Sequence, residues 1–169
     1  MGAMYLDRRH VMLATRTTNI WRLVLWITVC LGGGLVIGHA LRPDAWFRAL
    51  ERPAFAPPDW VFAPVWAILY VLMAVAMWRV ERYHRMRDVG GARTAFLGQL
   101  ALNFAWTPIF FGLHAVHLAL GVIVTLWCAI AATFVLFHRI DRTAAYLLVP
   151  CWAWVTFAIA LNGGYSFLN

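Results

Sequence analysis

The chain has 169 residues, of which 63% are hydrophobic and only 12% charged, whereas soluble domains carry roughly 25% charged residues. This composition argues against a soluble domain and indicates an integral membrane protein. The formal net charge of +7 comes from 14 basic residues, all arginine, which cluster between the apolar runs and do not form a basic stripe. Nucleic acid is therefore not expected as a partner.

The first element is a basic extension at residues 1–19, followed by an apolar run over about residues 20–41. A secretory signal peptide is the alternative interpretation, but the run is longer than a signal-peptide core and no A-x-A cleavage site follows it. We therefore expect a retained first membrane span. Within it, Gly34 and Gly38 form a G-x-x-x-G pattern that favours close packing against another helix.

The segment after the first span reads "RPDAWFRALERPAFAPPDW" and combines four prolines with two tryptophans and two phenylalanines. Proline fixes φ and removes a backbone donor, so this loop can be rigid without regular structure. Its aromatic residues, Trp46, Phe47, Phe55 and Trp60, have two interpretations. They form an ordinary aromatic belt at the membrane surface, or they fold back as a lid over a cavity in the bundle. Asp59 is predicted to cap the second span.

Four further apolar runs follow, at about residues 60–80, 94–113, 116–137 and 144–162. Each is near the roughly 20 residues that a spanning helix needs. A single helix through the third and fourth spans would be on the order of 65 Å long, about twice the thickness of the hydrocarbon core, so the chain must turn near residues 112–117. The predicted fold is an all-α bundle of five transmembrane helices, a single domain at residues 20–163 with a short tail at 164–169.

The arginines predict the orientation of this bundle. Successive loops of a multi-span protein lie on opposite sides of the membrane. This places three arginines, Arg42, Arg48 and Arg52, on one side and the other 11 on the opposite side. Because cytoplasmic loops carry the excess of basic residues, we expect a cytoplasmic N-terminus and an external C-terminus. The sequence does not indicate which cellular membrane holds the protein.

The third span carries two different faces. Gln99, Asn103, Trp106 and Phe110 follow helical spacing on one face, whereas Ala101, Ala105 and Gly112, with Pro108, follow it on the other. The face of small residues suits close packing, and we expect it to form a homodimer interface. Polar groups at this depth should face the bundle interior. There, Gln99 and Asn103 either hold neighbouring helices together or bind a ligand, and the face alone does not decide between these roles.

The remaining polar residues exclude several kinds of site. None of the six histidines lies mid-helix opposite another, no acidic residue lies within a span, and the cysteines have no paired spacing. We therefore expect no metal site, no bound haem held by two histidines, no disulfide framework and no intramembrane carboxylate relay. Pro64, Pro108 and Pro150 are predicted to kink the second, third and fifth spans.

Three segments in order, "RPAFAPPDWVFAPVWAILYVLMA", "GQLALNFAWTPIFFG" and "LLVPCWAWVTFAIALN", resemble the translocator protein family, TspO/MBR, also called tryptophan-rich sensory proteins or peripheral-type benzodiazepine receptors. The resemblance covers about residues 20–162. It implies a five-helix bundle, commonly a homodimer, whose first loop covers a cavity. It also implies porphyrin ligands such as protoporphyrin IX, with sterols or benzodiazepine-receptor ligands as further possibilities, and no required cofactor.

The residues matching the family pocket are Trp60, Trp66, Tyr70, Asn103, Trp106, Trp154, Ala158 and Leu161. This set overlaps the polar and aromatic face of the third span, from which we add Gln99 as a candidate ligand residue. Phe55 and Cys151 stand where many members have an indole or a hydroxyl. No basic residue follows Tyr165, so the proposed cholesterol motif is not supported.

Three functions are compatible with these features. The first is a receptor that binds a tetrapyrrole or another apolar small molecule, with a role in transport or stress regulation. The second is an enzyme that degrades protoporphyrin in light and oxygen, with Trp60, Trp66, Trp106 and Trp154 as candidate electron donors. The third is a structural partner in a membrane complex, in which the cavity has no ligand.

Overall fold

The computed structural model describes residues 20–83 and 88–169, so the basic extension at residues 1–19 lies outside the described residues. Every regular element in these two ranges is helical. Four of the described helices are long and apolar enough to cross a membrane: Ile20–Ala40, Asp59–Glu81, Val116–Ile140 and Arg142–Leu168. The expected all-α class is confirmed, and the chain has the helices of a multi-pass membrane protein.

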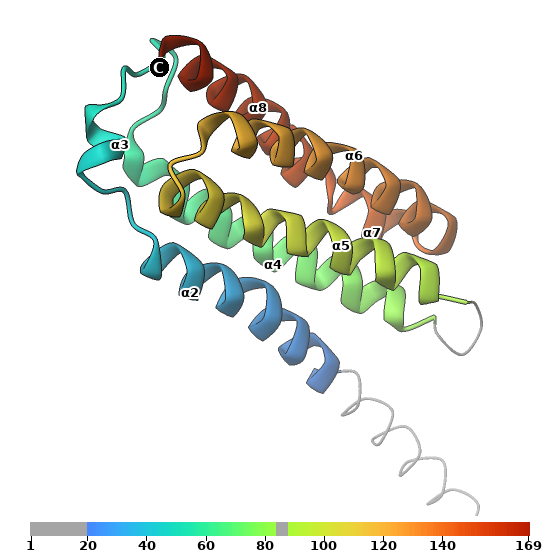
Figure 1. Ribbon diagram of the computed structural model, residues 1–169. Coiled ribbons are helices and arrows are strands. Elements are labelled where there is room, and N and C mark those ends of the chain that lie inside the picture. Colours follow the sequence, from blue (N-terminus) through green and yellow to red (C-terminus); the bar gives the residue numbers. More distant parts are fainter. Residues whose placement is uncertain (1–19, 84–87) are drawn as a thin grey trace, which may run out of the picture.

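The predicted third span, residues 94–113, is the helix α5 (Gly90–Thr107), which continues into one π-helical segment, η3 (Pro108–Gly112). This helix is less apolar than the four candidate spans because glycines, threonines and the amides Gln99 and Asn103 interrupt its apolar residues. Its amides are buried, at 1% and 3% exposed. Figure 1 shows α5 running the length of the bundle beside α4 and α6.

The other elements follow the predicted order. In chain order they are η1 (Thr28–Gly32), α2 (Gly33–Ala40), α3 (Ala45–Ala49), η2 (Asp59–Val61), α4 (Phe62–Glu81), α6 (Val116–Ile140), α7 (Arg142–Tyr146) and α8 (Val149–Leu168). The last predicted span is thus two helices, and α8 continues through Gly163 and Gly164 beyond the expected end at residue 162.

Pro64 and Pro150 lie near the beginnings of helices, whereas Pro108 lies where α5 continues into η3. Pro150 is the second residue of α8, so the expected kink is a break between α7 and α8. Pro64 is in the first turn of α4 and Pro108 begins η3. At Pro64 and Pro150 the missing N–H removes little helical hydrogen bonding, whereas at Pro108 it leaves a carbonyl of the preceding turn of α5 without its helical donor. The expected reversal near residues 112–117 is confirmed: between η3 and α6, His114 adopts a left-handed φ of 55°.

Two local predictions are wrong, one of them in part. Asp59 does not cap the second span, because its carboxylate forms an ion pair with Arg52 (2.9 Å) and no side chain caps η2. The G-x-x-x-G prediction is confirmed at Gly34 and wrong at Gly38, because the close approach of the first helix depends on Gly33 and Gly34. A Cβ at Gly33 would lie 2.7 Å from the Phe104 ring, and one at Gly34 would overlap Tyr70, whereas nothing lies within 4 Å of Gly38.

Ion pairs tie the helices together at the end of the bundle opposite α3 (Figure 1). Glu81, only 8% exposed, accepts a hydrogen bond from the Trp26 indole (2.9 Å) and pairs with Arg93 (3.0 Å). Arg79 pairs with Asp141 (2.9 Å), and that carboxylate also caps α7. Buried carboxylates are tolerated when they are paired in this way.

Candidate ligand-binding cavity

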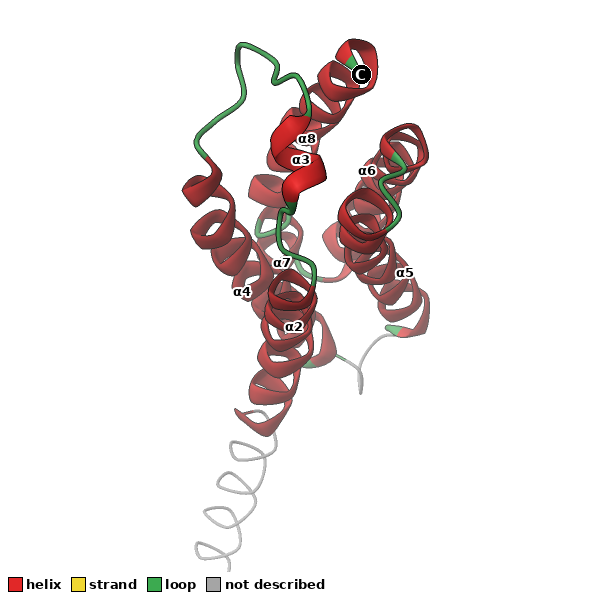
Figure 2. Ribbon diagram, turned by 60° about the vertical axis from the view of Figure 1, so that its left-hand side comes forward, coloured by secondary structure: helices red, strands yellow, loops and turns green. Residues whose placement is uncertain are grey.

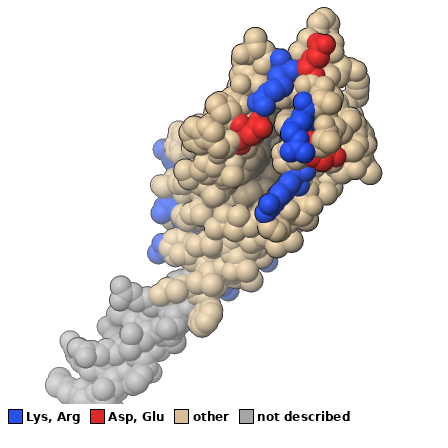
Figure 3. All heavy atoms as spheres, turned by 90° about the vertical axis from the view of Figure 1, so that its left-hand side faces the viewer, with Lys and Arg blue, Asp and Glu red and all other residues tan. Residues whose placement is uncertain are grey.

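A cavity of about 900 Å³ lies between α2, α4, α5 and α8, under the loop that contains α3. Its wall is mostly apolar, and its volume is within the range of roughly 300 to 1,000 Å³ that is usual for ligand sites. Figure 3 shows a hollow on this face with basic and acidic side chains around it. The bundle therefore has an apolar interior space with a charged mouth.

Most of the residues predicted to bind a ligand lie on the wall of this cavity: Trp66, Tyr70, Asn103, Trp106, Trp154, Ala158 and Leu161. Residues of α4, α5 and α8 meet here although they are distant in sequence. The Trp66 ring lies 5.5 Å from the Tyr70 ring, and Trp106 stacks on Phe110 at 5.0 Å. The wall therefore presents several aromatic faces to one space.

Two predicted residues lie elsewhere. Trp60 is 74% exposed and is not part of the wall. The other three candidate electron donors, Trp66, Trp106 and Trp154, line the cavity. Gln99 is buried, but its amide nitrogen points to the Met73 sulfur of α4 (3.5 Å) instead of to the cavity. The structure therefore separates Gln99 from Asn103, although both follow the same helical spacing.

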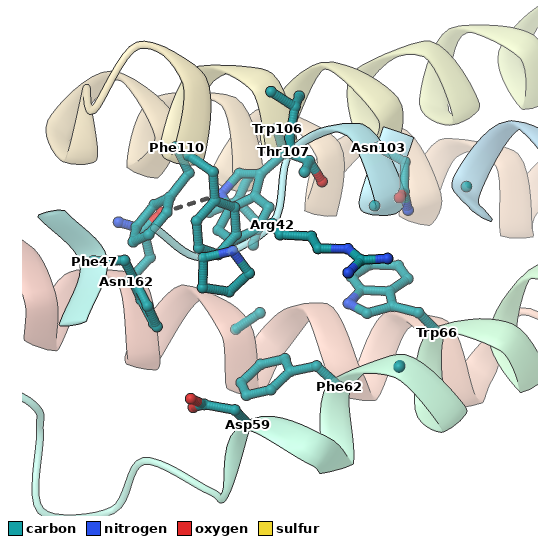
Figure 4. Close-up of a pocket in the computed structure, with 18 of the residues that line it drawn as sticks. Arg42, Phe47, Asp59, Phe62, Trp66, Asn103, Trp106, Thr107, Phe110 and Asn162 are labelled. Atoms are coloured by element: carbon teal, nitrogen blue, oxygen red, sulfur yellow. Dashed lines mark hydrogen bonds between the residues drawn. The ribbon is translucent and has the colours of Figure 1, made fainter. Parts of the chain in front are cut away.

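Asn103 is the most distinctive polar group on the wall. Its Oδ1 accepts a hydrogen bond from the Tyr70 hydroxyl (2.9 Å), while its Nδ2 has no partner among the described residues. The side chain is only 3% exposed, and Figure 4 shows it pointing from α5 toward the cavity. The buried Trp154 indole nitrogen also lacks a partner. Leaving a buried donor unpaired costs about 1–3 kcal/mol, so both donors favour a ligand that carries hydrogen-bond acceptors.

Asn162 fixes the position of the Trp106 indole. Its Oδ1 accepts from the Trp106 Nε1 (3.1 Å), and its Nδ2 donates to the Val116 carbonyl at the start of α6 (3.0 Å). The residue is 2% exposed and lies on the cavity wall (Figure 4). One side chain of α8 thus connects three helices and orients one aromatic face of the cavity.

Charged side chains stand at the mouth. Arg52 pairs with Asp59 (2.9 Å) and donates to the Pro57 carbonyl (3.0 Å), which holds the proline-rich loop together. Arg42 follows α2, and its guanidinium lies 2.6 Å from the His39 Nδ1. The segments that carry these charged side chains lie at the end of the bundle where α3 lies and where α8 ends (Figure 1).

The loop over the cavity is held to the bundle at two points, near its start and at its middle. Near its start, Asp44 caps α3 and pairs with His114 (3.1 Å), while the Trp46 ring stacks on the His114 ring at 4.2 Å. The hydrogen bond from the Phe47 N–H is the main reason that the pKa of Asp44 is lowered, and His114 adds to the effect. Farther along, the Glu51 N–H donates to the Asn169 side chain (3.0 Å).

The lid interpretation of this loop is supported for part of its aromatic residues. Phe47 lies on the cavity wall and packs against Phe111 (5.2 Å) and Tyr165 (5.6 Å). Phe55 and Trp60 remain exposed, at 54% and 74%. Figure 2 shows α3 lying across the end of the bundle between α2 and α8. The first half of the loop therefore covers the cavity, whereas its second half presents aromatic side chains outward.

Several wall residues were missed by sequence reasoning. Phe62 and Tyr165 are ordinary aromatic residues whose direction a one-dimensional pattern does not give. Asn162 could have been found, because it is an amide inside an apolar run beside the face that contains Trp154. Among the described residues, no three His, Cys, Asp or Glu side chains gather closely enough to hold a metal ion.

Comparison with known proteins places this architecture in a family. A model of the TspO/MBR family matches residues 26–168. The chain belongs to the TspO/MBR family. This TspO/MBR protein is 38% identical over 142 residues to a tryptophan-rich sensory protein of Cereibacter sphaeroides, covering 84% of this chain and 88% of that one.

Relatives of this TspO/MBR protein extend from bacteria to mammals. It is 37% identical over 146 residues to protein CrtK of Rhodobacter capsulatus, with 86% of this chain and 91% of that one covered. It is also 37% identical over 139 residues to the human translocator protein, where 78% of each chain is covered. The resemblance noted in the three sequence segments is therefore confirmed, and TspO/MBR membership supports a multi-pass membrane protein.

Proposed function

We propose that this protein binds a planar tetrapyrrole such as protoporphyrin IX in the cavity and acts in tetrapyrrole transport or stress regulation. The observation that carries the proposal is the unpartnered amide nitrogen of Asn103 on the wall of an otherwise aromatic cavity. A flat conjugated ligand gains about 0.5–1.5 kcal/mol from each aromatic contact beyond the burial of its area. Its acceptor atoms would complete the hydrogen bonding of Asn103 and Trp154.

The proposal is tested by tryptophan quenching with protoporphyrin IX, in the dark and without oxygen, on the protein purified in detergent. Asn103→Leu should weaken saturable binding by about tenfold, because a ligand acceptor then loses its donor. Gln99→Leu is the matched control, since it removes a buried amide one helical turn away that does not line the cavity. We expect this control to bind like the wild type.

Quenching that rises linearly and identically in all three proteins would contradict the proposal, because it would reflect partitioning of the porphyrin into detergent. Equal weakening in Asn103→Leu and Gln99→Leu would also contradict it, since both amides would then act only through helix packing. Circular dichroism of each variant confirms that the helical fold is retained.

We also propose that α5 with η3 is a fifth span, giving an external C-terminus and a cytoplasmic N-terminus. The amides Gln99 and Asn103 of α5 are buried and Thr107 lies on the cavity wall, so these three polar side chains need not contact lipid. The mouth with Arg42 and Arg52 would then face outward, in agreement with the smaller number of arginines expected on that side.

A homodimer formed through α5 is a further part of this proposal. Ala101 is exposed and Ala105 is half-buried, and the exposed Gly98 extends their row. Gly112 is also exposed, but the π-turn of η3 changes the spacing before it, and a Cβ there would lie 3.5 Å from Leu41. We therefore expect Gly98, Ala101 and Ala105 to form the closer contact.

Ala101→Leu is expected to lower the dimer fraction at least severalfold, because a bulky side chain keeps two α5 helices from approaching closely. Ala132→Leu is the matched control, since Ala132 is an exposed alanine on α6. Crosslinking and size-exclusion chromatography in detergent measure both variants. An unchanged dimer fraction in Ala101→Leu would remove α5 from the interface.

A further inference from the structure

Arg42 lines the cavity without a carboxylate partner among the described residues. The described ion pairs at this end join Arg52 to Asp59 and His114 to Asp44. Arg42 has instead a contact of 2.6 Å with the His39 Nδ1. In Figure 4 its side chain extends into the space of the cavity. A guanidinium at the wall of an apolar space is therefore left with donors that no acid of the described chain neutralises.

His39 orients this guanidinium but does not neutralise it. A guanidinium has only donors, so the facing Nδ1 of His39 must be the nitrogen without a proton, and the imidazole is neutral in this contact. One N–H of Arg42 is thereby used for positioning. The others remain available, and their planar arrangement fits a carboxylate through two parallel hydrogen bonds.

The carboxylates near Arg42 are paired with other groups, so Arg42 is the positive group on the wall that a ligand would meet. Asp59 is also on the wall, but its carboxylate is 2.9 Å from Arg52 and is compensated by it. Asp44 caps α3 and pairs with His114, outside the cavity wall. Deeper on the wall, the buried polar atoms without partners are both donors, on Asn103 and Trp154. The cavity thus lacks an uncompensated negative group for a cationic ligand.

We propose that Arg42, positioned by His39, binds a carboxylate at the edge of the ligand and makes the protein selective for amphipathic acids over neutral analogues. This inference rests on the proposed function, because it assigns the charged end of the same ligand. The ligand class is a rigid apolar body with a carboxylate at one edge. Arg42 is exposed at the mouth, so the apolar body enters the bundle while the carboxylate stays at the boundary.

The test compares protoporphyrin IX with its dimethyl ester, which has the same ring without the negative charges. Dissociation constants from tryptophan quenching are measured for the wild type, Arg42→Gln and Arg48→Gln in the same neutral detergent. Arg48 is the matched control, an exposed arginine on α3 that does not line the cavity. Partitioning of each porphyrin into detergent is the same for all three proteins. A difference between proteins in the ratio of the ester to the acid dissociation constant therefore reports the contribution of the protein.

We expect the wild type and Arg48→Gln to bind the acid about tenfold more tightly than the ester, as a charge-assisted hydrogen bond allows. In Arg42→Gln the acid should bind only about as tightly as the ester, so the ratio should fall close to one. The affinity for the ester should stay unchanged. His39→Leu should reduce the ratio by less than Arg42→Gln does, since it removes only the group that orients the guanidinium.

Two results separate the possible failures. Saturable binding of both porphyrins with the same ratio in the wild type and Arg42→Gln would overturn the role of Arg42 while leaving the proposed function intact. A thermal stabilisation by anionic lipid that disappears in Arg42→Gln would then assign the residue to a lipid headgroup. Absence of saturable binding of either porphyrin to the wild type would overturn the proposed function itself.

Discussion

Gly34→Ala is expected to lower the thermal stability of the protein, whereas Gly38→Ala should leave it unchanged or slightly raised. Both glycines lie in α2 and differ by one helical turn. Alanine is favoured over glycine in a helix by about 1 kcal/mol, and this gain applies at both positions. The difference arises from the neighbours, since a Cβ at Gly34 would overlap the Tyr70 ring and nothing lies within 4 Å of Gly38.

Tyr70 has little room to move away from a methyl group at position 34. Its ring is 8% exposed and lies between the Trp66 ring (5.5 Å) and the Phe104 ring (5.7 Å), and its hydroxyl is bonded to Asn103. Overpacking of this kind costs about 1–3 kcal/mol. Displacing Tyr70 would also disturb Asn103, so porphyrin affinity should fall together with stability.

Thermal unfolding followed by circular dichroism, with the porphyrin titration on the same samples, measures both effects. Gly38→Ala serves as the control for helix propensity in α2, at a position of the cavity wall where a Cβ meets no neighbour within 4 Å. If the two variants had equal melting temperatures and equal affinities, the close approach of α2 to Tyr70 would be refuted.

Asn162→Leu is expected to be the most destabilising change on the cavity wall. It leaves the Trp106 indole N–H and the Val116 carbonyl without their partner. Each unpaired buried group costs about 1–3 kcal/mol, and the apolar surroundings offer no substitute. The Trp106 ring would also lose its orientation, so binding of a flat ligand should weaken in the fraction of protein that remains folded.

A double-mutant cycle with Trp106→Phe isolates the hydrogen bond from the change in side-chain shape. In the Trp106→Phe background there is no indole donor to leave unpaired, so Asn162→Leu should cost less than in the wild type. Residues in direct contact show coupling of roughly 0.5–3 kcal/mol. Additive losses of unfolding free energy in the two backgrounds would show that Asn162 does not act through Trp106.

The sequence alone determined the helical membrane class, the reversal near residues 112–117 and the family. These are local properties, because the length and polarity of an apolar run decide whether it suits a bilayer. Helical spacing also placed Asn103 and Trp106 on one face of α5, and the family resemblance added Trp66, Tyr70, Trp154, Ala158 and Leu161, all of which line the cavity.

The tertiary structure decided which polar residues face the cavity and which pack between helices. Gln99 and Asn103 share a face of α5, yet one contacts Met73 and the other lies on the cavity wall. The path of a proline-rich loop put Phe47 over the cavity and left Trp60 outside. Helical periodicity fixes a direction around one axis, whereas a side chain's neighbour depends on how distant helices cross, so these contacts arise only when the bundle assembles.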